Sequence, residues 1–229
     1  MANHPAEGLG IDALVFDFDG VILDTETPFF HAWSEAYAEH GLELTIEEWS
    51  TCLGTHGGFD PLEDLAAKGA QFDADELLSR MRVRKDDLTD IDELLPGIEA
   101  WLGEAVELGL PVAVASSSTH EWVNGHLVRL QIADQFGHVS CREEGVPAKP
   151  QPDLYLRACE ALGVDPRRAL AVEDSPNGVT AAKAAGMFCI AVPHELTSGL
   201  DLAAADLLTS SLGDVTLRQV IEQLTRTTS

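Results

Sequence analysis

The stretch ALVFDFDG, residues 13–20, carries an apolar run that ends in two carboxylates, Asp17 and Asp19. The run from 13 to 18 is short and is followed by Gly20, which predicts a buried strand with a turn after it. A carboxylate at the end of a buried strand loses hydration, and this costs free energy unless a positive charge or a proton compensates it. The pair therefore indicates either a turn cap that water satisfies or one half of a functional site.

Strands and helices alternate along the chain after Pro96-Gly97. Alternation of this kind is typical of a parallel sheet that is covered by helices on both faces. We therefore expect an α/β fold with a Rossmann-like parallel sheet as its core. The predicted strands are 13–18, 111–116, 138–141, 169–173 and 187–192, and the predicted helices are 98–108, 120–130, 152–162, 177–185 and 214–225.

The stretch between residues 27 and 95 has no convincing strand and several helix signals. Apolar residues at helical spacing begin at Thr27, and the pattern stops at Gly41. We therefore expect a small all-helical cap domain, residues 25–94, inserted after the first strand of a core domain that comprises residues 1–24 and 95–229. Three further signals mark helix starts, namely the capping box TIEE at 45–48, Asp60-Pro61 and DADE at 73–76.

The chain is strongly acidic, with 39 acidic and 14 basic residues among 229 and a formal charge of −25. Such a surface repels nucleic acid and anionic membranes, and no segment approaches the length of a membrane span. The polar N-terminal sequence lacks a secretory signal pattern. We therefore expect a cytoplasmic protein without nucleic-acid or membrane partners, and the oligomeric state stays open, with a monomer as one option. Four separated cysteines, predicted to be reduced, agree with this: Cys52, Cys141, Cys159 and Cys189.

Polar residues follow several predicted strands at the point where each strand ends. Ligand sites in open parallel sheets form outside the carboxyl ends of the strands, where the strand order reverses. We therefore expect these residues to lie close together. They are Asp17 and Asp19 after the first strand, Ser116, Ser117 and Ser118 at the end of the second, Lys149 in AKPQPD before helix 152–162, and Glu173, Asp174 and Ser175 at the end of strand 169–173.

This set of side chains suits chemistry on a phosphate group. Several carboxylates in one place cannot all ionise without a counter-charge, and oxygen-rich sites of this kind suit Mg²⁺. Lys149 would supply a fixed positive charge, and Ser116 a hydroxyl donor to a phosphoryl oxygen. The small residues at 116–118 would let backbone amides approach an anion. The sequence therefore predicts a phosphoryl-transfer site that works by positioning and charge neutralisation.

Four motifs occur in order along nearly the whole chain: DFDG at 17–20, Ser116, Lys149 in KPQPD, and Glu173-Asp174 in VEDSPNG. With these motifs the chain resembles the haloacid dehalogenase superfamily, in the branch that carries a helical cap after its first strand. The resemblance implies a Mg²⁺-dependent hydrolase of phosphate monoesters that acts on a small phosphorylated metabolite, with a sugar phosphate as one option.

The resemblance also implies roles for individual residues. Asp17 would be the nucleophile that forms an aspartyl-phosphate, and Asp19 would protonate the leaving oxygen and then activate water. Ser116 and Lys149 would hold the phosphoryl group. The implied Mg²⁺ ligands are Asp17, the backbone carbonyl of Asp19, Asp174 and, directly or through water, Glu173.

The serines that follow Ser116 allow two interpretations. Ser117 is a further candidate for contact with the phosphate. The sequence SSTHE at 117–121 also fits a local helix cap, in which Ser118 and Glu121 form a capping pair.

Differences from relatives within the superfamily bear on the reaction. The dehalogenases lack the second carboxylate of the first motif and need no metal, so Asp19 and Asp174 argue against dehalogenation. Sugar-phosphate mutases of the β-phosphoglucomutase type share all four motifs, but they place a histidine where this chain has Phe29 and an arginine near Gly57. A phosphatase is therefore expected, with a phosphomutase as the alternative and a phosphate-binding regulatory protein as a third option.

Residues of the predicted cap would select the substrate. His56 lies in the glycine-flanked stretch GTHGG at 54–58, and Arg84 lies in the basic stretch RMRVRK at 80–85. Each is a candidate substrate contact, and each also fits an ordinary solvated residue. The identity of the phosphorylated substrate is not encoded in any motif.

Overall fold

The computed structural model describes residues 10–50, 59–89 and 93–227. Within these residues, six parallel strands form one sheet in the order β3-β2-β1-β4-β5-β6. The order reverses beside β1, because the chain passes from β1 to β2 on one side and returns to β4 on the other. The predicted α/β fold with a parallel sheet is confirmed. The strands are β1 (Ala13–Phe16), β2 (Val112–Thr119), β3 (His138–Arg142), β4 (Ala169–Glu173), β5 (Phe188–Ala191) and β6 (Leu207–Leu208).

The central strand β1 is buried along its whole length and packs on both sides. Leu14 and Phe16 belong to an apolar cluster on one face of the sheet. Ala13 and Val15 belong to a second cluster on the other face, because successive side chains of a strand point to opposite faces. A strand that is apolar at every position is therefore what a sheet with two covered faces requires.

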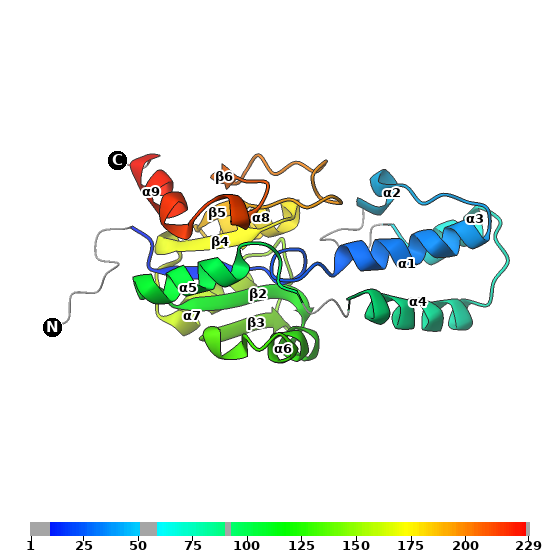
Figure 1. Ribbon diagram of the computed structural model, residues 1–229, viewed down its shortest axis with the longest axis horizontal. Helices are drawn as coiled ribbons and strands as arrows, with labels where there is room; N and C mark the ends of the chain where they lie inside the picture. Colours follow the sequence, from blue (N-terminus) through cyan, green and yellow to red (C-terminus); the bar gives the residue numbers. More distant parts are fainter. Residues whose placement is uncertain (1–9, 51–58, 90–92, 228–229) are drawn as a thin grey trace.

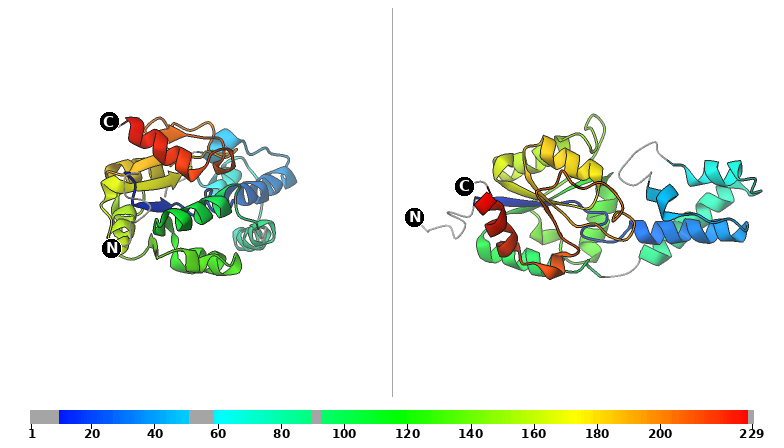
Figure 2. Two further views of the ribbon diagram at one scale, coloured as in Figure 1. Left: turned by 60° about the vertical axis from the view of Figure 1, so that its left-hand side comes forward. Right: turned by 90° about the horizontal axis from the view of Figure 1, so that it is seen from above.

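Helices cover both faces of the sheet (Figure 1, Figure 2). α5 (Ile98–Leu108), α6 (His120–Arg129) and α9 (Leu217–Thr227) contribute side chains to the first cluster. α7 (Asp153–Leu162) and α8 (Pro176–Ala184) contribute to the second cluster on the opposite face. The predicted bounds of α5 agree with the structure, and the other core helices begin and end close to their predicted residues.

The first strand is shorter than predicted because the chain turns at Phe18. The Asp17 amide still donates to the carbonyl oxygen of Val172 (2.9 Å), but β1 itself ends one residue earlier. The carbonyl oxygen of Phe18 then accepts from the Ile22 amide (2.9 Å), which closes a tight turn. Gly20 lies in this turn with a φ of +80°, a conformation that glycine adopts without strain.

In the described part of the chain, four helices between β1 and α5 pack around an apolar cluster of their own at one end of the sheet (Figure 1). This cap cluster includes Trp33, Trp49 and Leu65, and one residue from a core loop, Leu196. The arrangement is the one expected of an inserted helical cap, while the domain boundaries drawn from the sequence stay predictions. The cap helices are α1 (Glu26–Glu39), α2 (Ile46–Ser50), α3 (Pro61–Ala67) and α4 (Ala74–Thr89).

Side-chain hydrogen bonds confirm two predicted helix starts in the cap. The Thr45 hydroxyl accepts from the Glu48 amide (3.2 Å), and the Glu48 carboxylate accepts from the Thr45 amide (3.0 Å), which makes a capping box. At the start of α3, the Asp60 carboxylate accepts from the amides of Leu62 (2.8 Å) and Glu63 (3.2 Å). Short polar motifs thus fix where these helices begin.

The edge strand β6 was not predicted. It has only two residues, which is too few for an alternating pattern to reveal it. Among the residues that the structure describes, no helix combines the length and the apolar character needed to cross a bilayer.

Candidate active site

The carboxyl ends of β1 and β4 lie side by side and bring three acidic residues together. The strands pair with Phe16 opposite Val172, so Asp17 and Glu173 follow at the same edge of the sheet. Carboxylate oxygens of Asp17, Glu173 and Asp174 lie within 4.8 Å of one another, and all three residues are buried. The structure therefore unites the first and the last sequence motif in one carboxylate cluster.

Lys149 supplies a counter-charge inside the carboxylate cluster. Its Nζ lies 2.7 Å from Asp17 Oδ1 and 2.6 Å from Glu173 Oε1, and only 5% of its side chain is exposed. Burial lowers the pKa of Lys149, but the charges of Asp17 and Glu173 outweigh this effect and raise the pKa above its ordinary value. The lysine is therefore charged at neutral pH and holds the ends of two strands together.

The cluster carries more negative than positive charge. Burial raises the pKa of Asp17 well above its ordinary value, and the charge of Lys149 opposes only part of that rise. Burial also raises the pKa of Asp174, while a hydrogen bond from His194 opposes the rise. One lysine cannot balance three buried carboxylates. A hard divalent cation such as Mg²⁺, which prefers carboxylate oxygens, fits this donor set.

Glu173 is held more tightly than the other two carboxylates. Its Oε1 accepts from Lys149 Nζ (2.6 Å) and from the Tyr155 hydroxyl (2.7 Å), and its Oε2 accepts from the Asp174 amide (3.1 Å). Gly178 packs so closely against it that a Cβ atom there would lie 1.8 Å from Oε1. Glu173 is completely buried and thus fixes the position of Lys149.

Asp19 accepts hydrogen bonds at both carboxylate oxygens. Oδ1 accepts from the Thr25 hydroxyl (2.7 Å) and from the Trp122 Nε1–H (2.9 Å). Oδ2 accepts from the Ser118 hydroxyl (2.6 Å) and more distantly from the Ser116 hydroxyl (3.3 Å). These donors come from the segment before α1, from β2 and from α6, so the Asp19 carboxylate connects the start of the cap helices to the core.

The candidate phosphate-binding serines lie at the end of β2, next to the acidic residues. Ser116 is completely buried, and its hydroxyl also accepts from the Ser118 amide (3.0 Å). The Ser117 hydroxyl accepts from the Lys149 amide (3.3 Å), which ties the end of β2 to the loop that carries the lysine. The structure therefore brings Ser116, Ser117 and Lys149 to the same edge of the sheet as Asp17.

The predicted capping pair of Ser118 and Glu121 is wrong. β2 continues through Thr119, three residues beyond its predicted end, and α6 begins directly after it. The Thr119 hydroxyl, and not that of Ser118, accepts from the Trp122 amide (3.3 Å) and caps the helix. Ser118 is thereby free to donate to Asp19.

Four residues of the site escaped sequence reasoning: Thr25, Trp122, Tyr155 and His194. Trp122 and Tyr155 lie on α6 and α7, where the apolar pattern marks side chains that pack on the sheet but not those that reach a carboxylate. His194 lies just beyond β5, and its Nε2 is 3.1 Å from Asp174 Oδ2. A polar residue that follows a predicted strand is the signal that indicates the other site residues. The same signal applies to His194, which follows the predicted strand 187–192.

The two candidate specificity residues lie in the cap sequence. His56 falls outside the described residues. Arg84 on α4 forms a two-pronged ion pair with Glu35 on α1, with N···O distances of 2.7 and 2.8 Å. A substrate contact by either residue stays a prediction.

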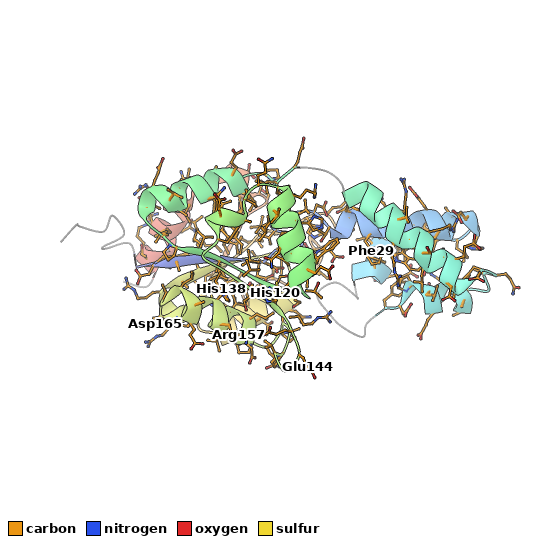
Figure 3. All side chains as sticks on the ribbon, turned by 90° about the horizontal axis from the view of Figure 1, so that it is seen from below. Phe29, His120, His138, Glu144, Arg157 and Asp165 are labelled. Carbon is orange, nitrogen blue, oxygen red and sulfur yellow. The ribbon has the colours of Figure 1, made fainter. Side chains whose placement is uncertain are left out.

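Phe29, which stands where the mutases have a histidine, is an apolar packing residue. Its ring meets Trp33 edge-on, with centroids 6.4 Å apart, and Trp49 in the same manner at 5.4 Å. Figure 3 shows Phe29 among the cap helices. A side chain of this kind cannot assist proton transfer to the substrate.

Comparisons with known proteins find matches along most of the chain. The family model described as "haloacid dehalogenase-like hydrolase" matches residues 11–186. "Putative phosphatase YhcW" of Bacillus subtilis is 40% identical over 215 residues, which cover 93% of this chain and 98% of that protein. Hexitol phosphatase B of Escherichia coli is 31% identical over 215 residues, covering 91% and 96%. A crystal structure of a mutant of CbbY from Rhodobacter sphaeroides in complex with xylulose-(1,5)bisphosphate gives a TM-score of 0.67 at 29% identity, covering 89% of this chain and 96% of that chain.

Proposed function

Because this chain belongs to the haloacid dehalogenase-like hydrolases and is a phosphoric monoester hydrolase, we propose that it is a Mg²⁺-dependent phosphatase of a small phosphorylated sugar or sugar alcohol. One observation carries the proposal: Lys149 Nζ lies between the carboxylates of Asp17 and Glu173 at the ends of the central strands, with Asp174 beside them. The sugar bisphosphate in the CbbY complex and the hexitol phosphatase among the relatives support the substrate class.

In the proposed reaction, a carboxylate oxygen of Asp17 attacks the phosphorus atom of the ester. The bond between phosphorus and the leaving oxygen breaks, and Asp19 gives its proton to that oxygen. A free alcohol and an aspartyl-phosphate on Asp17 result. Asp19 then takes a proton from a water molecule that attacks the phosphorus, and the departure of inorganic phosphate regenerates the Asp17 carboxylate.

The remaining residues would bind and orient the phosphoryl group. Lys149 and the hydroxyls of Ser116 and Ser117 are proposed to contact its oxygens. Bound Mg²⁺ would neutralise phosphoryl charge. Its proposed ligands are Asp17, Asp174, the backbone carbonyl of Asp19 and, directly or through water, Glu173. The hydrogen bonds at both Glu173 oxygens favour the water-mediated arrangement for that residue.

We expect Trp122→Phe to lower kcat about tenfold with little change in KM. The substitution keeps an aromatic ring beside His126 but removes the Nε1–H that holds Asp19 Oδ1 at 2.9 Å. A typical hydrogen bond contributes about 0.5–1.5 kcal/mol, and its loss lets the proton-transfer residue leave its position. Steady-state phosphate release at saturating substrate measures the effect.

Trp101→Phe is the matched control for this substitution. Trp101 on α5 donates its Nε1–H to the carbonyl oxygen of Val215 at 3.0 Å, so the control also loses one indole hydrogen bond. It should keep the wild-type kcat, because that bond does not involve Asp19. Equal kcat values for wild type and Trp122→Phe would contradict the assigned role of the indole.

A phosphate-release assay across monophosphates of sugars, sugar alcohols, nucleotides and small acids tests the proposed function. We expect release from one or more sugar-type esters that stops in EDTA and returns when Mg²⁺ is added. Conversion of a sugar 1-phosphate into its 6-phosphate without free phosphate would show a mutase instead. Binding of the esters without turnover would show a phosphate-binding protein.

The proposal includes a cytoplasmic location and no nucleic-acid or membrane partner. The described cysteines, Cys141, Cys159 and Cys189, carry free buried thiols, which suits a reducing compartment. The formal charge of −25 opposes contact with anionic polymers and lipid surfaces. The oligomeric state stays open.

A further inference from the structure

The loop that follows β5 contacts both the carboxylate cluster and the cap. Its first residue, Val192, donates its amide to the carbonyl oxygen of Glu173 (2.7 Å). Figure 1 and Figure 2 show this orange loop reaching from the sheet toward the cap helices. His194 of this loop contacts the carboxylate cluster, and Leu196 contacts the cap.

The imidazole of His194 holds the carboxylate of Asp174. Its Nε2 lies 3.1 Å from Asp174 Oδ2, and 15% of the histidine side chain is exposed. The other ring nitrogen, Nδ1, faces the Leu196 amide at 3.4 Å and accepts its hydrogen. Nε2 therefore carries the ring hydrogen and donates it to Asp174. This hydrogen bond fixes the rotation of the Asp174 carboxylate.

The turn after β1 packs directly against Asp174 and His194. A Cβ atom at Gly20 would lie 2.4 Å from Asp174 Oδ2 and 3.1 Å from His194 Nε2. Only a residue without a side chain lets the turn, the end of β4 and the loop after β5 meet at this point. The contact between His194 and Asp174 is therefore built into the packing of three segments.

Leu196 anchors the same loop in the cap. It is 2% exposed and belongs to the cap cluster with Trp33 and Trp49, and not to either cluster of the core. The Thr197 hydroxyl accepts from the His194 amide (3.0 Å), which closes a tight turn that contains Leu196. Leu196 and His194 therefore belong to one hydrogen-bonded turn and lie two residues apart.

We propose that His194 is a positioning residue for Asp174 and that the loop at 192–200 links divalent-cation binding to the packing of Leu196 in the cap. When Leu196 leaves the cap cluster, the turn moves and the His194 hydrogen bond no longer holds Asp174 toward the cation. By linkage, a bound cation favours the packed position of Leu196 by the same factor. The inference rests on the proposed function only in taking Asp174 as a cation ligand.

Isothermal titration calorimetry with Mg²⁺ on the full chain tests this proposal without relying on turnover. We expect His194→Ala to weaken Mg²⁺ binding about tenfold or more, as occurs when a residue that orients a metal ligand is lost. His194→Gln, whose side-chain N–H can replace the imidazole Nε2–H, should stay within about threefold of the wild type. Circular dichroism checks that each variant is folded.

The link to the cap is tested by a double-mutant cycle. Leu196→Ala should weaken Mg²⁺ binding about fivefold in the wild-type background and have no effect in the His194→Ala background. Leu65→Ala is the matched control, because it makes the same truncation in the same cap cluster but on α3, at the far end of the cap (Figure 1). Its Mg²⁺ affinity should equal that of the wild type.

Wild-type Mg²⁺ affinity in His194→Ala would overturn the positioning role. If Leu196→Ala weakened Mg²⁺ binding equally in the wild-type and His194→Ala backgrounds, the link to the cap would be overturned. The same holds if Leu65→Ala weakened Mg²⁺ binding as much as Leu196→Ala does. His194-dependent Mg²⁺ binding in a chain that releases no phosphate from any ester would support the inference and overturn the proposed phosphatase. Absence of Mg²⁺ binding in the wild type would overturn the inference.

Discussion

Asp17→Asn should abolish phosphate release, with a fall in kcat of about 10⁴-fold or more. Asparagine keeps the shape of the side chain but has no carboxylate oxygen that could form an acyl phosphate. The variant should fold, because Lys149 keeps Glu173 as a partner at 2.6 Å and because burial already disfavours the charge of Asp17. Phosphate release from the best ester of the screen, measured with Mg²⁺, gives the fold-change.

A second readout separates loss of the nucleophile from loss of binding. After rapid quenching with a ³²P-labelled ester, the wild-type chain should carry label, and Asp17→Asn should carry none. Asp165→Asn is the matched control, since Asp165 pairs with Arg167 at the end of the core far from the cap (Figure 3). It should keep the wild-type kcat. If Asp17→Asn retained more than about 1% of the wild-type kcat, Asp17 would not be the nucleophile.

Lys149→Met should cause a large loss of stability together with loss of activity. Methionine has a similar length but no charge, so the carboxylates of Asp17 and Glu173 stay buried without their shared partner. Breaking a buried ion pair by removing one member costs about 3–5 kcal/mol. Urea unfolding in EDTA, where no added cation can take the place of the lysine, measures the change in the free energy of unfolding.

The loss in free energy of unfolding caused by Lys149→Met should grow as the pH rises. Burial holds the pKa of Asp17 above its ordinary value, and the charge of Lys149 is the largest influence that lowers this pKa. Without the lysine, the pKa of Asp17 in the folded protein rises further. A carboxyl group with a higher pKa in the folded state stabilises the fold fully below its unfolded pKa and loses this contribution as the pH passes through the folded value. The variant should therefore lie closer to the wild type at pH 5 than at pH 8.

Lys183→Met serves as the control for loss of a lysine. Lys183 pairs with Asp206 at the surface, where both side chains are about one-third exposed, and an exposed pair contributes little. Its unfolding free energy should stay near that of the wild type at both pH values. A similar, pH-independent loss in Lys149→Met and Lys183→Met would contradict the role of Lys149 as the counter-charge of the cluster.

Features that depend on neighbours along the chain could be predicted from the sequence. The apolar run before Asp17 predicts a strand that is buried on both faces, and the gap between Thr27 and the next strand predicts the helical insertion. The rule that sites form at the carboxyl ends of strands then predicts that Asp17, Lys149 and Asp174 lie together. These predictions succeed because the spacing of apolar residues, the turn residues and the order of the elements can all be read directly from the sequence.

Features that depend on contacts between distant segments could not be predicted. β2 extends to Thr119 because it pairs with β3 beyond an irregularity, and this extension moves Ser118 from a helix cap to Asp19. Trp122 and His194 reach their carboxylates from a helix and a loop whose rotation is set by packing on the sheet. The direction of a side chain on such an element is a tertiary property, so the residue type alone does not reveal it.

The position of β1 at the centre of the sheet also sets the order in which the nascent protein can become active. Leu14 pairs with Val112 in β2 and with Leu170 in β4, both of which are synthesised much later. The cap helices, in contrast, lie within 26–89, so the described cap cluster except Leu196 is synthesised before β2. Until β4 emerges from the ribosome, β1 is an apolar strand with a free edge, the kind of segment that aggregates or recruits chaperones. Catalytic competence is therefore among the last properties that the growing chain acquires.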